Sequence, residues 1–108
     1  MHIHVDPTTT PPRLTLAEPD DFKAFSVVVR PARATDDAAM ASIAALGELD
    51  GAGHVFVHRA TIESLAGHRA DQAEWARGLD AMVRYASEHG WLDGAGRIRA
   101  HITIEGGD

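Results

Sequence analysis

Polar and apolar residues alternate in four segments of the chain, a pattern that predicts β-strands. The weakest segment is residues 13–16, which fits an edge strand, and the others are residues 24–30, 54–59 and 97–105. Their valines, isoleucines and phenylalanines pack well on a pleated sheet. In each segment one face is apolar while the other carries mainly polar and charged side chains. We therefore expect a sheet with one buried face and one open face.

Two longer segments carry apolar residues at helical spacing. The first begins at Thr35, Asp36 and Asp37, because a hydroxyl and carboxylates satisfy the free N–H groups of a first turn. It is expected to reach residue 46 and to bury one stripe of side chains, formed by Met40, Ile43, Ala44 and Gly47. Residues 61–66 predict a single helical turn that Gly67 closes.

The clearest helix of the chain is predicted to open at residues 71–74, where Asp and Glu have the spacing of a capping box. Gly90 is placed to end it. Its apolar residues fall on one stripe that should face the core, formed by Trp75, Leu79, Met82, Val83 and Ala86.

The order strand, helix, strand, helix, strand favours an α/β (or α+β) fold. We expect a two-layer sandwich in which a small, mostly parallel sheet carries the two main helices on one face. A ferredoxin-like fold is the alternative, with residues 13–16 as an additional strand. Residues 1–12, with their run of threonines and prolines, are interpreted as a flexible N-terminal arm, and residues 13–108 as a single α/β domain.

The segment Leu-Asp-Gly-Ala-Gly occurs twice, at residues 49–53 and 92–96. Residues 37–59 align with residues 80–102 at a constant offset of 43, which makes His58 and His101 equivalent positions. We interpret the two copies as an internal repeat of helix, turn and strand. The glycines suit turns, and no strand precedes them as a phosphate-binding loop would require.

Composition narrows the classes of protein that the chain can belong to. A chain of 108 residues without cysteine excludes disulfides, thiolate nucleophiles and cysteine-bound zinc, and fits a reducing compartment. Its net charge of -6 argues against nucleic acid, and no apolar stretch is long enough to predict a membrane span. Frequent alanine, arginine and glycine favour a bacterial source. We expect a small cytoplasmic bacterial protein.

Histidines and arginines gather near the carboxyl ends of the predicted strands, where open α/β sheets bind ligands. His58 and His101 are the candidate catalytic pair, because neighbouring parallel strands would bring their rings within about 5 Å. The candidate residues for binding a small anionic ligand are Arg30, Arg59, Arg99 and Glu63. The other interpretation is that these side chains are solvated strand ends or interface residues.

No metal site and no cofactor are predicted. His2 and His4 would share one side of an extended segment, but no third ligand accompanies them. His54 and His58 would lie about 13 Å apart along a strand and could not share an ion.

Two functions remain compatible with the sequence. In the first, the protein is a self-associating or partner-binding domain, a homodimer or larger assembly held through its uncovered sheet face, which includes Val28 and Phe56. The alternative is a small cofactor-independent acid–base enzyme acting on an anionic metabolite, with Arg30 as clamp and His58 or His101 as proton carrier. Neither nucleic acid nor a membrane is an expected partner.

Overall fold

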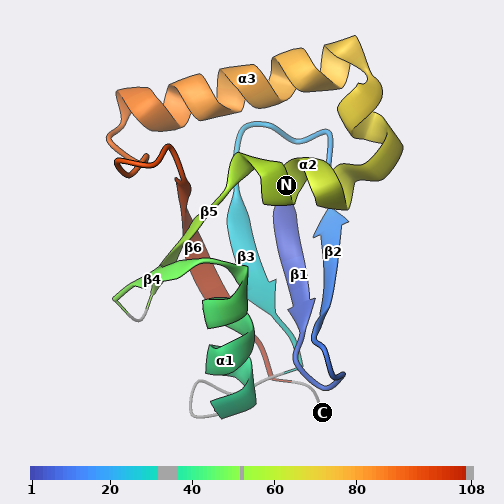
Figure 1. The fold of residues 1–108 in the computed structure, drawn as a ribbon, viewed down its shortest axis with the longest axis vertical. Coiled ribbons are helices and arrows are strands. Elements are labelled where there is room, and N and C mark those ends of the chain that lie inside the picture. Colours follow the sequence, from blue (N-terminus) through green and yellow to red (C-terminus); the bar gives the residue numbers. More distant parts are fainter. Residues whose placement is uncertain (32–36, 52, 107–108) are drawn as a thin grey trace.

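The computed structural model describes residues 1–31, 37–51 and 53–106, which form an α+β fold with a mixed six-stranded sheet (Figure 1). The strands are β1 His2–Asp6, β2 Arg13–Ala17, β3 Ser26–Val29, β4 Glu48–Asp50, β5 His54–Val57 and β6 Ile98–Ile104. The helices are α1 Asp37–Leu46, α2 Arg59–Ala66 and α3 Ala73–Glu88, with the short 3-10 helix η1 Gly67–Asp71 between the last two.

The strands follow the order β2-β1-β3-β6-β5-β4 across the sheet. Only β1–β3 and β3–β6 are parallel pairs, and the other neighbours are antiparallel. The expectation of a mostly parallel sheet is therefore wrong. Only residues 7–12 separate β1 from β2 and only residues 51–53 separate β4 from β5, and connections this short link antiparallel strands. The ferredoxin-like alternative also fails, because that fold pairs its strands antiparallel throughout.

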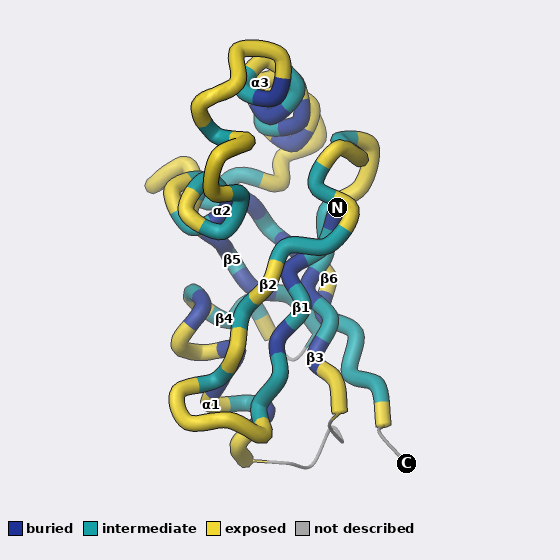
Figure 2. The backbone as a smooth tube through the Cα atoms, turned by 90° about the vertical axis from the view of Figure 1, so that its right-hand side faces the viewer, coloured by how far each residue is buried: buried dark blue, intermediate teal, exposed yellow. Residues whose placement is uncertain are grey.

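The helices cover the sheet unevenly. Figure 2 shows α1 and α2 against one face, whereas α3 crosses the end of the sheet above them. The expectation that both main helices lie on one face is thus wrong for α3. Its position follows from its partners: the Trp75 indole Nε1 donates a hydrogen bond to the Pro19 carbonyl at 2.8 Å and meets the Phe22 ring edge-on at 5.8 Å between centroids.

The alternation of the strands builds the core as the sequence predicts. Along β1, β3, β5 and β6 every second residue is buried, and these residues are Ile3, Val5, Val27, Val29, Val55, Val57, Ile98, Ala100 and Ile102. The stripe expected on α3 is confirmed for four of its members, since Trp75, Leu79, Met82 and Ala86 are buried. On α1 only Ile43 of the predicted stripe is buried, together with Ala39, Ser42 and Leu46.

The first residues of the chain do not form the predicted arm. Residues 2–6 are β1, which lies between β2 and β3, and Ile3 and Val5 are fully buried. The N-terminal ammonium donates hydrogen bonds to the carbonyls of Asp21 and Ala24 at 3.0 and 3.1 Å. The proline-rich run after β1 is the turn into the edge strand β2, whose place at the edge is confirmed.

The residues that flank the two Leu-Asp-Gly-Ala-Gly segments pair in the same register. Leu49 pairs with Val55 in the first copy, and Leu92 pairs with Ile98 in the second, so each leucine meets the residue six positions later. Asp93 fixes the second turn, where its carboxylate accepts hydrogen bonds from the backbone N–H groups of Ala95 and Arg97 at 3.0 and 2.8 Å.

The helix starts differ from the expected ones. Asp71 belongs to η1, and Gln72 occupies the N-cap of α3 without a side-chain cap, so no capping box forms. The predicted start at Thr35 and Asp36 lies outside the described residues. The turn expected at residues 61–66 is part of a longer helix, α2. This helix begins at Arg59, soon after the end of β5, and buries Ile62.

Candidate ligand-binding site

One transverse row of the sheet brings three histidines onto the open face. The pairing registers align the residues Ala17, His2, Ser26, His101, His54 and Asp50 in neighbouring strands. Residues that pair directly across a ladder point to the same face of a sheet. The face opposite the core therefore carries a line of imidazoles that ends at a carboxylate.

His54 and His101 form the closest histidine pair of this row. Their ring centroids lie 5.3 Å apart and the ring planes meet at 69°. The predicted pair of His58 with His101 is wrong, because β5 and β6 are antiparallel and the register opposes His101 to His54. His58 follows the other end of β5, where it is exposed at the N-cap of α2.

Arg99 stands beside this pair and connects it to Asp50. Its Nε donates a hydrogen bond to the Asp50 carboxylate at 2.7 Å, and its Nη2 lies 3.3 Å from Nδ1 of His54. A guanidinium can only donate, so Nδ1 of His54 accepts and the ring proton sits on Nε2. The Nε2–H group of His54 thereby stays available as a donor to a ligand.

The environment of His54 favours the neutral ring. Burial lowers the pKa of His54 below the ordinary value of 6.5, and the positive charges of Arg99 and His101 lower it further. The carboxylate of Asp50 acts in the opposite direction. At neutral pH the site therefore combines a fixed positive charge on Arg99 with an uncharged imidazole at its side.

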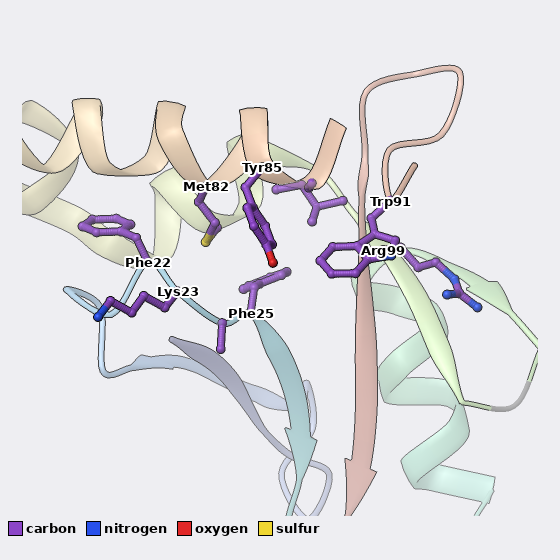
Figure 3. Close-up of a pocket in the computed structure, with 10 residues that line it drawn as sticks. Phe22, Lys23, Phe25, Met82, Tyr85, Trp91 and Arg99 are labelled. Carbon is purple, nitrogen blue, oxygen red and sulfur yellow. The ribbon is translucent and has the colours of Figure 1, made fainter. Parts of the chain in front are cut away.

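These polar groups open onto a hollow of about 230 Å³, lined by Phe25, His54, Trp91, Arg99 and His101. Trp91 is held at the rim because its carbonyl accepts a hydrogen bond from the backbone N–H of Arg99 at 2.8 Å. Figure 3 shows the rings of Trp91, Phe25 and Tyr85 gathered between α3 and the sheet. The lining of the hollow therefore combines two aromatic side chains with one guanidinium and two imidazoles.

The remaining predicted ligand-binding residues lie elsewhere. Arg30 directly follows β3 at the opposite end of the sheet and forms an ion pair with Glu105 at 3.3 Å. Arg59 pairs with Glu63 at 3.3 Å and with Asp80 of α3, an arrangement that ties α2 to α3. Of the predicted site residues, Arg99 and His101 lie together at the hollow, whereas Arg59 and Glu63 meet only each other, away from it.

His2 and His4 occupy a second hollow on the open face. It has a volume of about 340 Å³ and is lined mainly by β1, β2 and β3, with Arg30 and Glu105 at one end. Nε2 of His4 lies 3.0 Å from the carbonyl oxygen of Arg30. Within the described ranges, no three histidine, aspartate or glutamate side chains come close enough together to hold a metal ion.

Sequence reasoning missed His54, Phe25 and Trp91 as site residues. The alternation of residues 54–59 places His54 on the open face, but local spacing relates it only to His58. Its partnership with His101 follows from the antiparallel register, which depends on where the chain turns. Trp91 directly precedes the second Leu-Asp-Gly-Ala-Gly turn, and only the hairpin brings it beside Arg99.

Comparison with protein-family models, with curated proteins and with solved structures finds no match to this chain. Among the helices of the described residues, none has the length and apolarity needed to cross a bilayer. The function has to be argued from the site itself.

Proposed function

We propose that this protein is a small binding domain that takes an anionic ligand on the open face of its sheet, at His54, Arg99 and His101. The observation that supports it most directly is their convergence on one hollow beside the aromatic side chains of Phe25 and Trp91. A concave site with a few convergent polar groups and a titratable group of shifted pKa is the usual form of a small-molecule site.

The anion would be held mainly by Arg99. Its Nε is engaged by Asp50, and the guanidinium has further N–H groups to offer a carboxylate or phosphate. Nε2–H of His54 and the ring of His101 would add hydrogen bonds from the neighbouring strands. Asp50 already neutralises part of the Arg99 charge, so it competes with a bound anion.

The competition between Asp50 and a bound anion for Arg99 allows the proposal to be tested. We would titrate the protein with acetate and with inorganic phosphate and follow the ring-proton NMR signals of His54 and His101. Arg99→Gln should weaken binding about tenfold to a hundredfold, the usual worth of a hydrogen bond to a charged group. Asp50→Asn should strengthen it.

Arg30→Gln is the matched control, because Arg30 lies on the same face but at the other end of the sheet, paired with Glu105. It should leave anion binding unchanged. Equal weakening by Arg30→Gln and Arg99→Gln would mean that the anions respond to overall charge and not to this site. Ring signals that stay fixed in both titrations would also refute the proposal.

Self-association is a second proposal, in which another copy of the chain covers the open face over β1 and β3. The hollow there contains His2, His4 and Val28, and β2 at the sheet edge has one side without a partner strand among the described elements. Phe56 contributes less to such an interface than the sequence suggests, because the Arg97 guanidinium lies over its ring at 5.9 Å.

The acid–base enzyme has less support. It requires Arg30 as clamp beside His58 or His101, whereas Arg30 pairs with Glu105 at the other end of the sheet and His101 is opposed to His54. What favours some acid–base role is the lowered pKa of His54, which leaves a neutral imidazole beside the proposed anion site.

A further inference from the structure

The hollow at Arg99 combines a positive charge with aromatic side chains. Trp91, which is 40% exposed, and Phe25 form two of its walls. Trp91 contacts Tyr85, which is also exposed, and exposed apolar side chains that cluster in this way are typical of binding sites. The indole is also held in place, stacked on the His89 ring at 4.8 Å and meeting Tyr85 edge-on at 5.7 Å between centroids.

The size of the hollow limits what can occupy it. An engineered cavity of about 150 Å³ holds one benzene molecule, so a hollow of about 230 Å³ has room for one six-membered ring and a small charged group. The adjoining crevice between Phe22, Phe25, Met82 and Tyr85 measures about 60 Å³ and is too small for a second ring (Figure 3).

We infer that the ligand of this site is a planar aromatic carboxylate with a single ring. The ring would lie against Trp91 and Phe25, and the carboxylate would face Arg99 and His101. Aromatic rings gain more against an indole than their area alone gives, because edge-to-face and offset contacts are favourable. An inorganic anion or a short aliphatic acid would leave both aromatic walls bare. This inference rests on the proposed function and adds the class of ligand to it.

The probe that tests it is 4-fluorobenzoate, followed by fluorine NMR, with acetate as the charge without the ring and 4-fluorobenzyl alcohol as the ring without the charge. We expect 4-fluorobenzoate to bind about tenfold tighter than acetate, the gain for a ring packed on two aromatic walls. The alcohol should bind at least about tenfold more weakly than the benzoate, because it offers no charge to Arg99.

Variants separate the two halves of the ligand. Trp91→Ala should reduce the affinity for 4-fluorobenzoate toward that for acetate, because Phe25 is then the one aromatic wall left. Trp91→Phe, which keeps a ring, should retain the affinity within about threefold. Arg99→Gln should weaken both carboxylates. Arg84→Gln, on the exposed side of α3, is the control that should change neither. Trp75 is buried, so its fluorescence reports whether each variant is folded.

The outcomes distinguish this inference from the proposed function. If acetate shifts the His54 ring signals but 4-fluorobenzoate binds no tighter, the aromatic ligand is refuted while the anion site stands. If neither carboxylate shifts them, both proposals fail. Equal affinities for the alcohol and the benzoate would mean that the hollow binds the ring without using the charge of Arg99, which would also overturn the inference.

Discussion

Replacing Gly78 by alanine tests how α3 is fixed on the end of the sheet. Gly78 lies in the middle of α3, and a Cβ added there would meet the Phe22 ring at 2.3 to 2.6 Å. Atoms cannot approach so closely, so the ring would have to leave its place beside Trp75. Helix propensity alone predicts the opposite sign, because alanine stabilises a helix interior by about 1 kcal/mol relative to glycine.

The magnitude follows from setting these two effects against each other. Forcing extra volume into a packed contact costs about 1 to 3 kcal/mol, part of which is the Phe22–Trp75 edge contact, worth about 0.5 to 1.5 kcal/mol. After the gain in propensity we expect Gly78→Ala to lower the free energy of unfolding by about 1 kcal/mol. For a domain of this size that change lowers Tm by about 4 to 8 °C.

Urea unfolding followed by tryptophan fluorescence would measure the change, and Phe22→Ala provides the matched background. Without the ring there is nothing for the new methyl group to displace, so Gly78→Ala should then stabilise the protein by about 1 kcal/mol. A stabilisation of equal size in both backgrounds would refute the reasoning, since it would mean that Phe22 does not pack on α3.

Four further predictions concern the core, the histidine pair, the pH dependence of stability and the assembly. Leu79→Ala should lower the free energy of unfolding by about 2 to 5 kcal/mol in urea titrations, because Leu79 is 1% exposed and its loss leaves a cavity; a loss well below 1 kcal/mol would contradict the buried stripe. In ring-proton NMR titrations His101→Gln should raise the pKa of His54, whereas His58→Gln should not, and no change with His101→Gln would remove the coupling. Since the unfolded chain takes up a proton at His54 before the folded protein does, this residue should make stability fall as pH drops from 6.5 toward its lowered pKa. Light scattering at micromolar concentration should give at least twice the monomer mass, and a value of 11.6 kDa would end the self-association proposal.

The sequence predicted those parts of the fold that local periodicity determines. Alternation along residues 97–105 correctly separated the buried Ile98 and Ala100 from Arg99 and His101 on the open face. Helical spacing likewise identified the buried side of α3 at Trp75. Both inferences need only the geometry of one element and the preference of apolar side chains for the interior.

Strand pairing could not be predicted in the same way, because it depends on contacts between distant segments. The prolines after residues 2–6 predict an extended arm, whereas burial of Ile3 in the core makes these residues the strand β1. The error in the histidine pair has the same cause. A parallel arrangement brings His58 to His101, and the antiparallel one brings His54 there.

The two Leu-Asp-Gly-Ala-Gly copies explain why the repeated histidine was misleading. Phe56 and Arg99 are equivalent positions of the two copies, 43 residues apart, and they pair with each other in the sheet. Because β5 and β6 are antiparallel and centred on this pair, a local two-fold rotation relates the two strands. Other equivalent residues of the two strands therefore lie at opposite ends of the strand pair. His101 therefore lies opposite His54 and not beside its counterpart His58. If the repeat arose by duplication, the proposed site is not a doubled copy of one ancestral site. The site combines different parts of the two copies. Asp50 and His54 come from β4 and β5 of the first copy, and Arg99 and His101 come from β6 of the second.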